Sequence, residues 1–299
     1  MKKLNVSFDG TADPTGYLFS LMKCLSAALR CGGYAEFADD IVAASGFAFR
    51  MWAAPDLCPS ETSIWEFAAQ KRWVENGGLT CGYAERLWGQ DDIEAERRET
   101  AIKLIRDSTD NGTAAVAWDI SGCEWGLVTG YDDDTETFAT LRINGQEDTV
   151  RYEKLGRLEL PILSVLTVTG KAPKAPEQLV ADTKALAKDH LLGNEWCDNA
   201  KGLAAYDTIM SYTGGADAEA WKLMYTLGTY AALKSYAVRF FRKYNEDRLA
   251  ERYETIYGCW KDAFDAVKAT SSVSETTRRL VISDLGKAKS EETVAVDEM

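Results

Sequence analysis

The sequence predicts an α+β domain followed by an all-helical domain. Three observations lead to this prediction: helical apolar spacing up to residue 111, short β-branched and aromatic segments between residues 113 and 168, and nearly uniform helical patterning after a run of Pro and Lys at 171–176. Because such a polar, proline-containing run is typical of a linker, we expect a domain of residues 1–170 and a helical domain of residues 171–299.

Glycines mark the expected helix ends in the first half, since glycine readily adopts the left-handed conformation that follows many helices. We expect four helices there, over residues 24–31, 37–46, 61–76 and 92–111. The spacing then changes to short segments rich in Val, Ile, Thr and aromatic residues, separated by turn residues. These segments predict an antiparallel sheet with strands over residues 113–120, 124–132, 137–143 and 159–168.

The second half is expected to be a helical bundle. Apolar stripes at helical spacing are typical of a bundle core. The expected helices cover residues 176–192, 195–213, 217–244, 246–270 and, more briefly, 274–285. The tail KSEETVAVDEM is polar, and we expect it to fray.

The net charge of the chain narrows the range of partners. Its 34 basic and 47 acidic residues give −13 over 299 residues, and residues 1–170 carry 16 basic against 27 acidic residues. Nucleic-acid binding and binding to anionic membrane surfaces both rely on Lys and Arg, so we expect neither partner. The chain shows no signal peptide and no membrane-spanning stretch, which predicts a cytoplasmic protein. Oligomerisation stays open.

The seven cysteines show no paired spacing of the CxxC type. In a reducing compartment they are expected to be free thiols, and no zinc site is predicted. The glycine pairs lack the following Lys-Ser/Thr of a phosphate-binding loop, so no cofactor is expected. The segment Asp132–Asp134 with Glu136 has oxygen ligands suited to calcium, but Asp-rich runs between strands more often form hairpin turns.

Two segments carry a pattern suited to acyl chemistry. In LMKCLSAALRCGGY, Cys24 lies near the start of a predicted helix, where the helix dipole favours a thiolate. The second segment, GTAAVAWDISGCEWGLVTGYDDDTETFATLRING, predicts strand, turn, strand, Gly-Tyr-Asp-Asp and strand. A cysteine near a helix start is usually structural when it occurs alone, so only the two segments together indicate acyl chemistry.

In this order, the two segments resemble the papain-like fold. Over residues 15–170 the chain is similar to the domain found at the N-terminus of butirosin biosynthesis protein H and, more distantly, to peptidases that cleave double-glycine leader peptides. The matching pieces are CLSAALRCGGY, ASGFAFR, the start of the strand after Gly112 and EWGLVTGYDDD. The resemblance implies a cysteine-type acyltransferase or amidohydrolase acting on a small-molecule or peptide acyl substrate, with an acyl carrier protein as a possible partner, in secondary-metabolite or peptide processing.

The resemblance also implies which residues form the site. Cys24 corresponds to the nucleophile, Asn144 to the orienting residue, and Glu124 occupies the position of the catalytic histidine. Trp118 and Trp125 are expected to line a substrate cleft or to pack in the core, and Tyr131 of the Gly-Tyr pair is the third expected substrate contact.

The glutamate is a departure from the family pattern, because a histidine activates a thiol whereas an ionised carboxylate raises its pKa. Three interpretations of Glu124 remain open: a protonated acid that donates to a substrate carbonyl, a base for an attacking amine, or a remnant in a catalytically inactive binding protein. The one histidine, His190, belongs to the helical half and is expected at a surface or boundary position. A metalloprotein is a further alternative and would require carboxylates that converge in space.

Overall fold

The structure, a computed structural model that describes residues 1–60, 66–270 and 272–299, divides into two compact units, each made of several chain segments. The first unit comprises Met1–Thr11, Ser20–Ile41 and Phe67–Lys174. The second comprises Ala12–Phe19, Val42–Glu66 and Ala175–Met299. The change of unit after Lys174 lies close to the expected boundary at residue 170, but two early segments group with the helical half.

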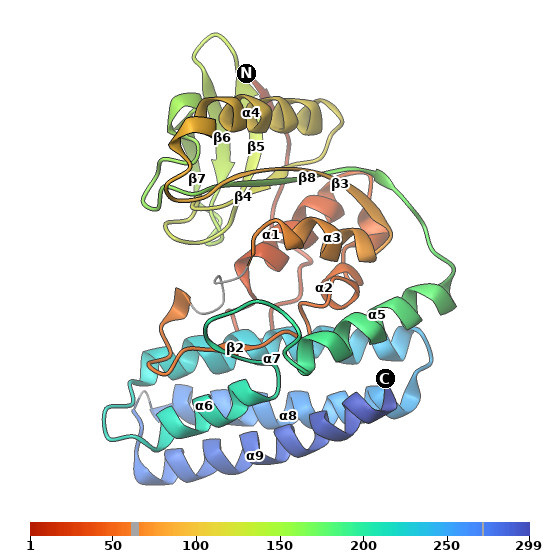
Figure 1. The fold of residues 1–299 in the computed structure, drawn as a ribbon, viewed down its shortest axis with the longest axis vertical. Coiled ribbons are helices and arrows are strands. Elements are labelled where there is room, and N and C mark those ends of the chain that lie inside the picture. The colour runs from red at the N-terminus through yellow and green to blue at the C-terminus, as the bar shows by residue number, and fades with distance from the viewer. Residues whose placement is uncertain (61–65, 271) are drawn as a thin grey trace. The chain divides into compact units, whose positions relative to one another are not determined.

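The first unit is an α+β structure around an antiparallel sheet, as the sequence predicts (Figure 1). The strand order is β3-β8-β4-β5-β6-β7, and β1 pairs with β5. The strands are β1 (Lys2–Lys3), β3 (Leu79–Arg86), β4 (Ala115–Ala117), β5 (Gly126–Asp132), β6 (Thr137–Leu141), β7 (Glu147–Arg151) and β8 (Leu163–Lys171).

Helices lie on both faces of this sheet (Figure 1). Helix α4 (Glu94–Asp110) packs on β3 and β8, and its Ala101 and Ile105 join Val128 and Val165 in a buried apolar core. Helices α1 (Ser20–Cys31) and α3 (Ala69–Asn76) contact the strands from the other face. Both end directly before a Gly pair, as predicted.

The helix expected over residues 37–46 is reduced to α2 (Ile41–Ala44), which follows a single 3₁₀ turn. Gly46 has a φ of 81°, and a Cβ at this position would lie 2.5 Å from Nε2 of His190. Only glycine therefore allows the chain to turn here against the imidazole, and the helix ends before it. Most of the shortening is at the start, where the chain forms the 3₁₀ turn Ala35–Phe37 before α2 begins at Ile41.

The second unit is mainly helical (Figure 1). Its long helices are α5 (Pro176–Leu191), α6 (Ala204–Gly214), α7 (Ala220–Lys243), α8 (Asp247–Thr270) and α9 (Glu275–Glu298). A short antiparallel pair, β2 (Trp52–Ala53) with β9 (Ala200–Lys201), joins an early segment to the loop before α6. In the part of the chain that the structure describes, no helix is long and apolar enough to cross a membrane.

Hydrogen bonds attach the early segments of the second unit to α7. The hydroxyl of Thr15 donates to the carbonyl of Gly228 at 2.8 Å, and the hydroxyl of Tyr230 accepts from the backbone N–H of Trp52 at 2.9 Å. Each bond joins residues about 180–210 positions apart in the sequence. Such long-range pairing leaves no local signal in the sequence. The change of composition near residue 170 therefore does not reveal that the early segments belong to the second unit.

A buried polar network lies at the centre of the helical unit. Lys234 and Glu292 are both fully buried and form an ion pair at 2.6 Å. The hydroxyls of Tyr206 and Tyr253 donate to the same carboxylate at 2.7 and 3.0 Å, and the indole N–H of Trp260 donates to Tyr206 at 2.9 Å. Each of the four side chains Lys234, Tyr206, Tyr253 and Trp260 therefore donates a hydrogen bond within this network.

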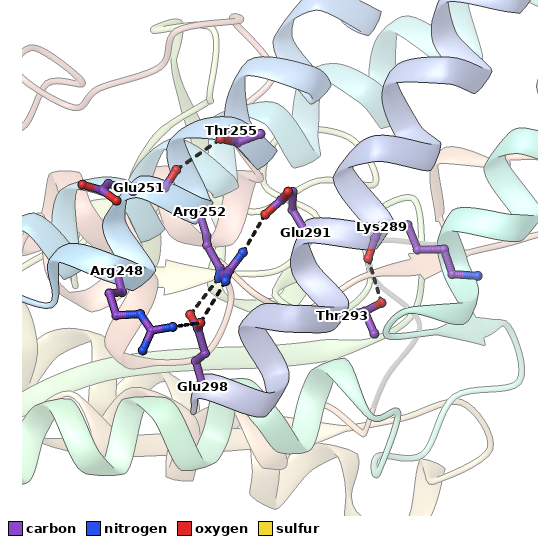
Figure 2. A network of polar contacts seen from close by, with 8 residues as sticks. All are labelled: Arg248, Glu251, Arg252, Thr255, Lys289, Glu291, Thr293 and Glu298. Carbon is purple, nitrogen blue, oxygen red and sulfur yellow. Dashed lines mark hydrogen bonds and ion pairs between the residues drawn. The ribbon is translucent and has the colours of Figure 1, made fainter.

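The C-terminal tail is helical, so the expectation that residues 289–299 fray is wrong. Helix α9 continues to Glu298 because Glu292, Ala295 and Val296 are buried against the other helices. Figure 2 shows the exposed side of the same helix, where Arg252 of α8 bonds Glu291 and Glu298 at 2.7–2.9 Å. The tail is therefore held by a buried pair on one side and by a more exposed network on the other.

Candidate functional site

The expected site residues other than Tyr131 lie at or near one end of the sheet in the first unit. The register pairs Arg86 of β3 with Leu163 of β8, and Ala117 of β4 with Gly126 of β5. The last residues of β3 and β4 therefore lie at the same end as the first residues of β5 and β8. The loop of residues 118–125, which carries Trp118, Glu124 and Trp125, crosses this end.

Asp119 holds the loop in shape. Its backbone has a φ of 66°, and its carboxylate accepts from the backbone N–H of Cys123 at 2.7 Å and of Leu160 at 2.6 Å. The N–H of Ser121 also donates to the carbonyl of Glu124 at 3.2 Å. These bonds fix the backbone of the loop and so the direction in which the Glu124 side chain points. The sequence offered only a weak signal for this role, an Asp two residues before Ser-Gly.

Glu124 contacts the first residue of helix α1. The hydroxyl of Ser20 donates to Oε2 of Glu124, and the backbone N–H of Trp125 donates to the same hydroxyl at 3.3 Å. Ser20 is 3% exposed, whereas Glu124 is only partly buried. Sequence reasoning missed Ser20, because a serine four residues before Cys24 has no distinctive pattern.

Cys24 lies one turn further along α1 and its side chain is completely buried. Burial raises the pKa of the Cys24 thiol far above its ordinary value, and the negative charge of Glu124 raises it further, against a smaller opposing effect of Lys23. Cys24 is the fifth residue of the helix, so the free N–H groups of the first turn precede it. Glu124 thus lies near enough for its charge to act on the Cys24 thiol, in a setting that keeps the thiol protonated.

Asn144 lies in the exposed turn between β6 and β7. Its side-chain oxygen accepts from the backbone N–H of Gln146 at 3.0 Å, which closes the turn. The neighbouring N–H of Ile143 donates to the hydroxyl of Ser121 at 3.1 Å. The turn is therefore attached to the loop that carries Glu124. The side chain of Asn144 itself bonds within its own turn.

Trp118 and Trp125 belong to a buried aromatic cluster with Phe67. The three rings have centroids 5.3–5.7 Å apart, and each residue is at most 6% exposed. Of the two open interpretations, core packing describes these tryptophans better than the lining of a cleft. The ring of Phe67 thus packs against both ends of the loop that carries Glu124.

Tyr131 lies on the other face of the sheet. An irregularity of the β5–β6 register between Val128 and Gly130 shifts the alternation of side chains. The Tyr131 ring consequently packs against the core beneath α4, and its hydroxyl donates to Asp110 of α4 at 2.9 Å. It does not join Trp118 and Trp125, because its ring lies on the other face and because Tyr131 lies next to the last residue of β5, whereas Trp125 directly precedes the first.

His190 is buried in the second unit, so the expected surface or boundary position is wrong. The imidazole is 1% exposed, and its Nδ1 lies 3.3 Å from the carboxylate of Glu195. That carboxylate also forms an ion pair with the buried guanidinium of Arg50 at 2.5 Å. The guanidinium lies over the rings of Phe47 and Trp52, at 4.7 and 4.0 Å from their centroids. His190 therefore has a structural role within its own unit.

The buried imidazole predicts a loss of stability in mild acid. Burial lowers the pKa of His190 from 6.5 to about 4, against the opposing hydrogen bond with Glu195. Between pH 6.5 and 4 the unfolded chain takes up a proton at His190 that the folded chain does not, so stability present above pH 6.5 is lost as the pH falls. We expect a loss of about 3 kcal/mol from this group.

Urea unfolding followed by circular dichroism at pH 7 and pH 4.5 measures this loss. His190→Gln lacks the titrating group and is expected to lose clearly less stability over the same interval than the natural chain. Equal losses in both proteins would assign the pH dependence to other groups.

Among the residues that the structure describes, side chains of the types that ligate metals converge at one place. Asp119, Cys123 and Glu159 offer ligand atoms within 4.8 Å of one another, but both carboxylate oxygens of Asp119 already accept backbone N–H groups. In the Asp132–Asp134 segment, Asp133 instead pairs with Arg106 at 2.8 Å and Asp132 accepts from the N–H of Asp134 at 3.1 Å. This segment is a hairpin turn.

Comparison with known proteins adds no relationship to this geometry. No protein-family model matches the chain, and no curated protein matches it at a significant level.

Proposed function

We propose that this protein binds its ligand at the end of the sheet that carries Glu124 and does not form a covalent intermediate on Cys24. The papain-like relationship, and with it an acyl- or peptide-type ligand, remains part of this proposal. The observation that carries it is the state of Cys24: a thiol without solvent exposure, whose pKa is raised by burial and by the neighbouring carboxylate.

A thiol nucleophile must be reachable and must ionise. The thiolate is the reactive form, and reactive cysteines occur in partly exposed, electropositive surroundings. The surroundings of Cys24 are the reverse, since the thiol is buried and the negative charge of Glu124 acts more strongly on its pKa than the positive charge of Lys23. The carboxylate is itself occupied by the hydroxyl of Ser20, which favours a positioning role over that of a base for the thiol.

Ser20, Cys24 and Trp125 are buried, whereas the carboxylate-bearing Glu124 beside them is partly exposed to solvent. A carboxylate accepts hydrogen bonds and carries negative charge. We therefore expect ligands that offer N–H donors or an amine, such as a peptide or an aminoacyl compound.

Alkylation tests the proposal directly. In native protein treated with iodoacetamide and mapped by mass spectrometry, we expect modification of the exposed Cys31 and Cys123 and none of Cys24. After unfolding in urea, Cys24 should react like the others. Cys123 is the matched control because it lies on the loop of Glu124. Faster labelling of Cys24 than of Cys123 in the native protein would overturn the proposal.

An acyl donor provides the second arm. Incubation with the acetyl thioester of N-acetylcysteamine is expected to leave no acetyl group on Cys24, and thioester cleavage should be equal in the natural chain and in Cys24→Ala. An adduct on Cys24, or cleavage lost in the variant, would support the cysteine-type enzyme instead.

A further inference from the structure

Three arginines of the first unit converge on a single carboxylate. Glu94, the first residue of α4, is 7% exposed and forms ion pairs with Arg98 and Arg157. The guanidinium of Arg86, at the end of β3, lies 3.6 Å from the other oxygen of the same carboxylate. The group therefore lies at the same end of the sheet as Glu124.

Backbone carbonyls of one loop hold two of these guanidiniums in place. Arg86 donates to the carbonyls of Pro161 and Gly156 at 2.5 and 2.9 Å, and Arg98 donates to the carbonyl of Leu155 at 3.2 Å. The Nε of Arg86 is buried and has no hydrogen-bond partner among the described residues. The arginine side chains are thus positioned before any ligand arrives, and one buried donor is still unsatisfied.

The charges of the cluster do not balance. Three guanidiniums face one carboxylate, which leaves an excess of two positive charges in a chain whose net charge is −13. The nearby Glu153 pairs with Arg151 at 3.4 Å. Burial lowers the pKa of Arg98, and the charges of Arg157 and Arg86 lower it further, against a smaller opposing effect of Glu153. The arginines therefore repel one another, and a second anion would relieve this repulsion.

Solvent reaches the cluster from one side. The Arg157 side chain is 56% exposed and that of Arg98 is 17% exposed, whereas Arg86 is 3% exposed. The backbone N–H of Glu94 already donates to the carbonyl of Asp91 in the preceding 3₁₀ turn, so the donors offered to a ligand are the guanidinium N–H groups. A small anion can thus approach over Arg157 and Arg98 toward the start of the helix.

We propose that Arg86, Arg98 and Arg157 form a binding site for a phosphate group or a comparable oxyanion. The planar guanidinium group presents paired N–H donors that match two oxygens of a phosphate. Here the anion would share the guanidiniums with Glu94 and neutralise the excess charge. This assignment is independent of the proposed role of Glu124.

Calorimetric titration with inorganic phosphate and with pyrophosphate, at constant ionic strength in sodium chloride, tests the site. We expect saturable binding to the full chain and a loss of about tenfold or more in affinity in Arg157→Gln. Arg142→Gln removes the same charge from another exposed arginine of the unit, paired with Asp148, and is expected to bind like the natural chain. The absence of saturable binding by about 10 mM, or equal losses in the two variants, would overturn the proposal.

Glu94→Gln separates binding from folding. This change removes the carboxylate that competes for the arginines, so phosphate should bind more tightly than to the natural chain. A gain in affinity cannot result from damage to the fold. Unchanged or weaker binding in a variant with a native circular dichroism spectrum would contradict the site, and if this variant does not fold, the two arginine variants decide alone.

Discussion

Replacing Glu292 by alanine is expected to destabilise the helical unit by about 3–5 kcal/mol. The substitution leaves the ammonium group of Lys234 fully buried without its counter-charge, and it removes the acceptor of two buried tyrosine hydroxyls. Burial already lowers the pKa of Lys234 against the opposing effect of Glu292. Urea unfolding followed by circular dichroism measures the change.

Arg252→Ala is the matched control on the neighbouring helix. Its two ion pairs, drawn in Figure 2, are partly exposed, so the loss should be no more than about 1 kcal/mol. The double variant Lys234→Met, Glu292→Leu removes both charges together and should recover most of the lost stability. A loss below about 1 kcal/mol for Glu292→Ala would show that the buried pair contributes little to the stability of the fold.

Glu195→Ala is expected to cost a similar amount, about 3–5 kcal/mol. The carboxylate is the counter-charge of Arg50, whose buried guanidinium lies over two aromatic rings. Although burial raises the pKa of Glu195, the hydrogen bond with His190 and the charge of Arg50 lower it to about 2. The carboxylate is thus ionised at pH 7 and well into the acid range, and its removal takes this counter-charge from a buried guanidinium.

Thermal unfolding at pH 7, set beside Asp265→Ala, tests this prediction. Asp265 pairs with Lys261 one helical turn away on a more exposed face, and its loss should cost no more than about 0.5 kcal/mol. If the two variants unfold at the same temperature, the pair of Arg50 and Glu195 has no special importance.

The outline of the fold followed from local patterns. Glycine pairs placed the ends of α1 and α3 correctly, and β-branched segments located β4, β5, β6 and β8. The strands β3 and β7 were not anticipated. In β7 most side chains are polar and exposed, so the apolar signal on which the prediction of strands depends is missing.

The sequence predicted the candidate site only where the order of residues along the chain indicates which side chains act together. The approach of Glu124 to Cys24 was anticipated, but the burial of Cys24 and the hydroxyl of Ser20 were not. Burial depends on which distant segments cover a helix, and no local pattern records it. Tyr131 was assigned to the wrong neighbours because one irregular register step, which the sequence does not reveal, moves its ring to the other face.

The second unit combines early and late segments of the chain, and this affects folding during synthesis and the behaviour of truncated fragments. Residues 12–19 and 42–66 leave a ribosome early, yet their partners on α7 follow about 180–220 residues later. Until then, apolar side chains such as Phe47, Phe49 and Trp52 lack the surface that buries them in the finished fold. A fragment ending at Lys174 would expose the same residues, so we expect it to aggregate. The two units are therefore best expressed together as one chain.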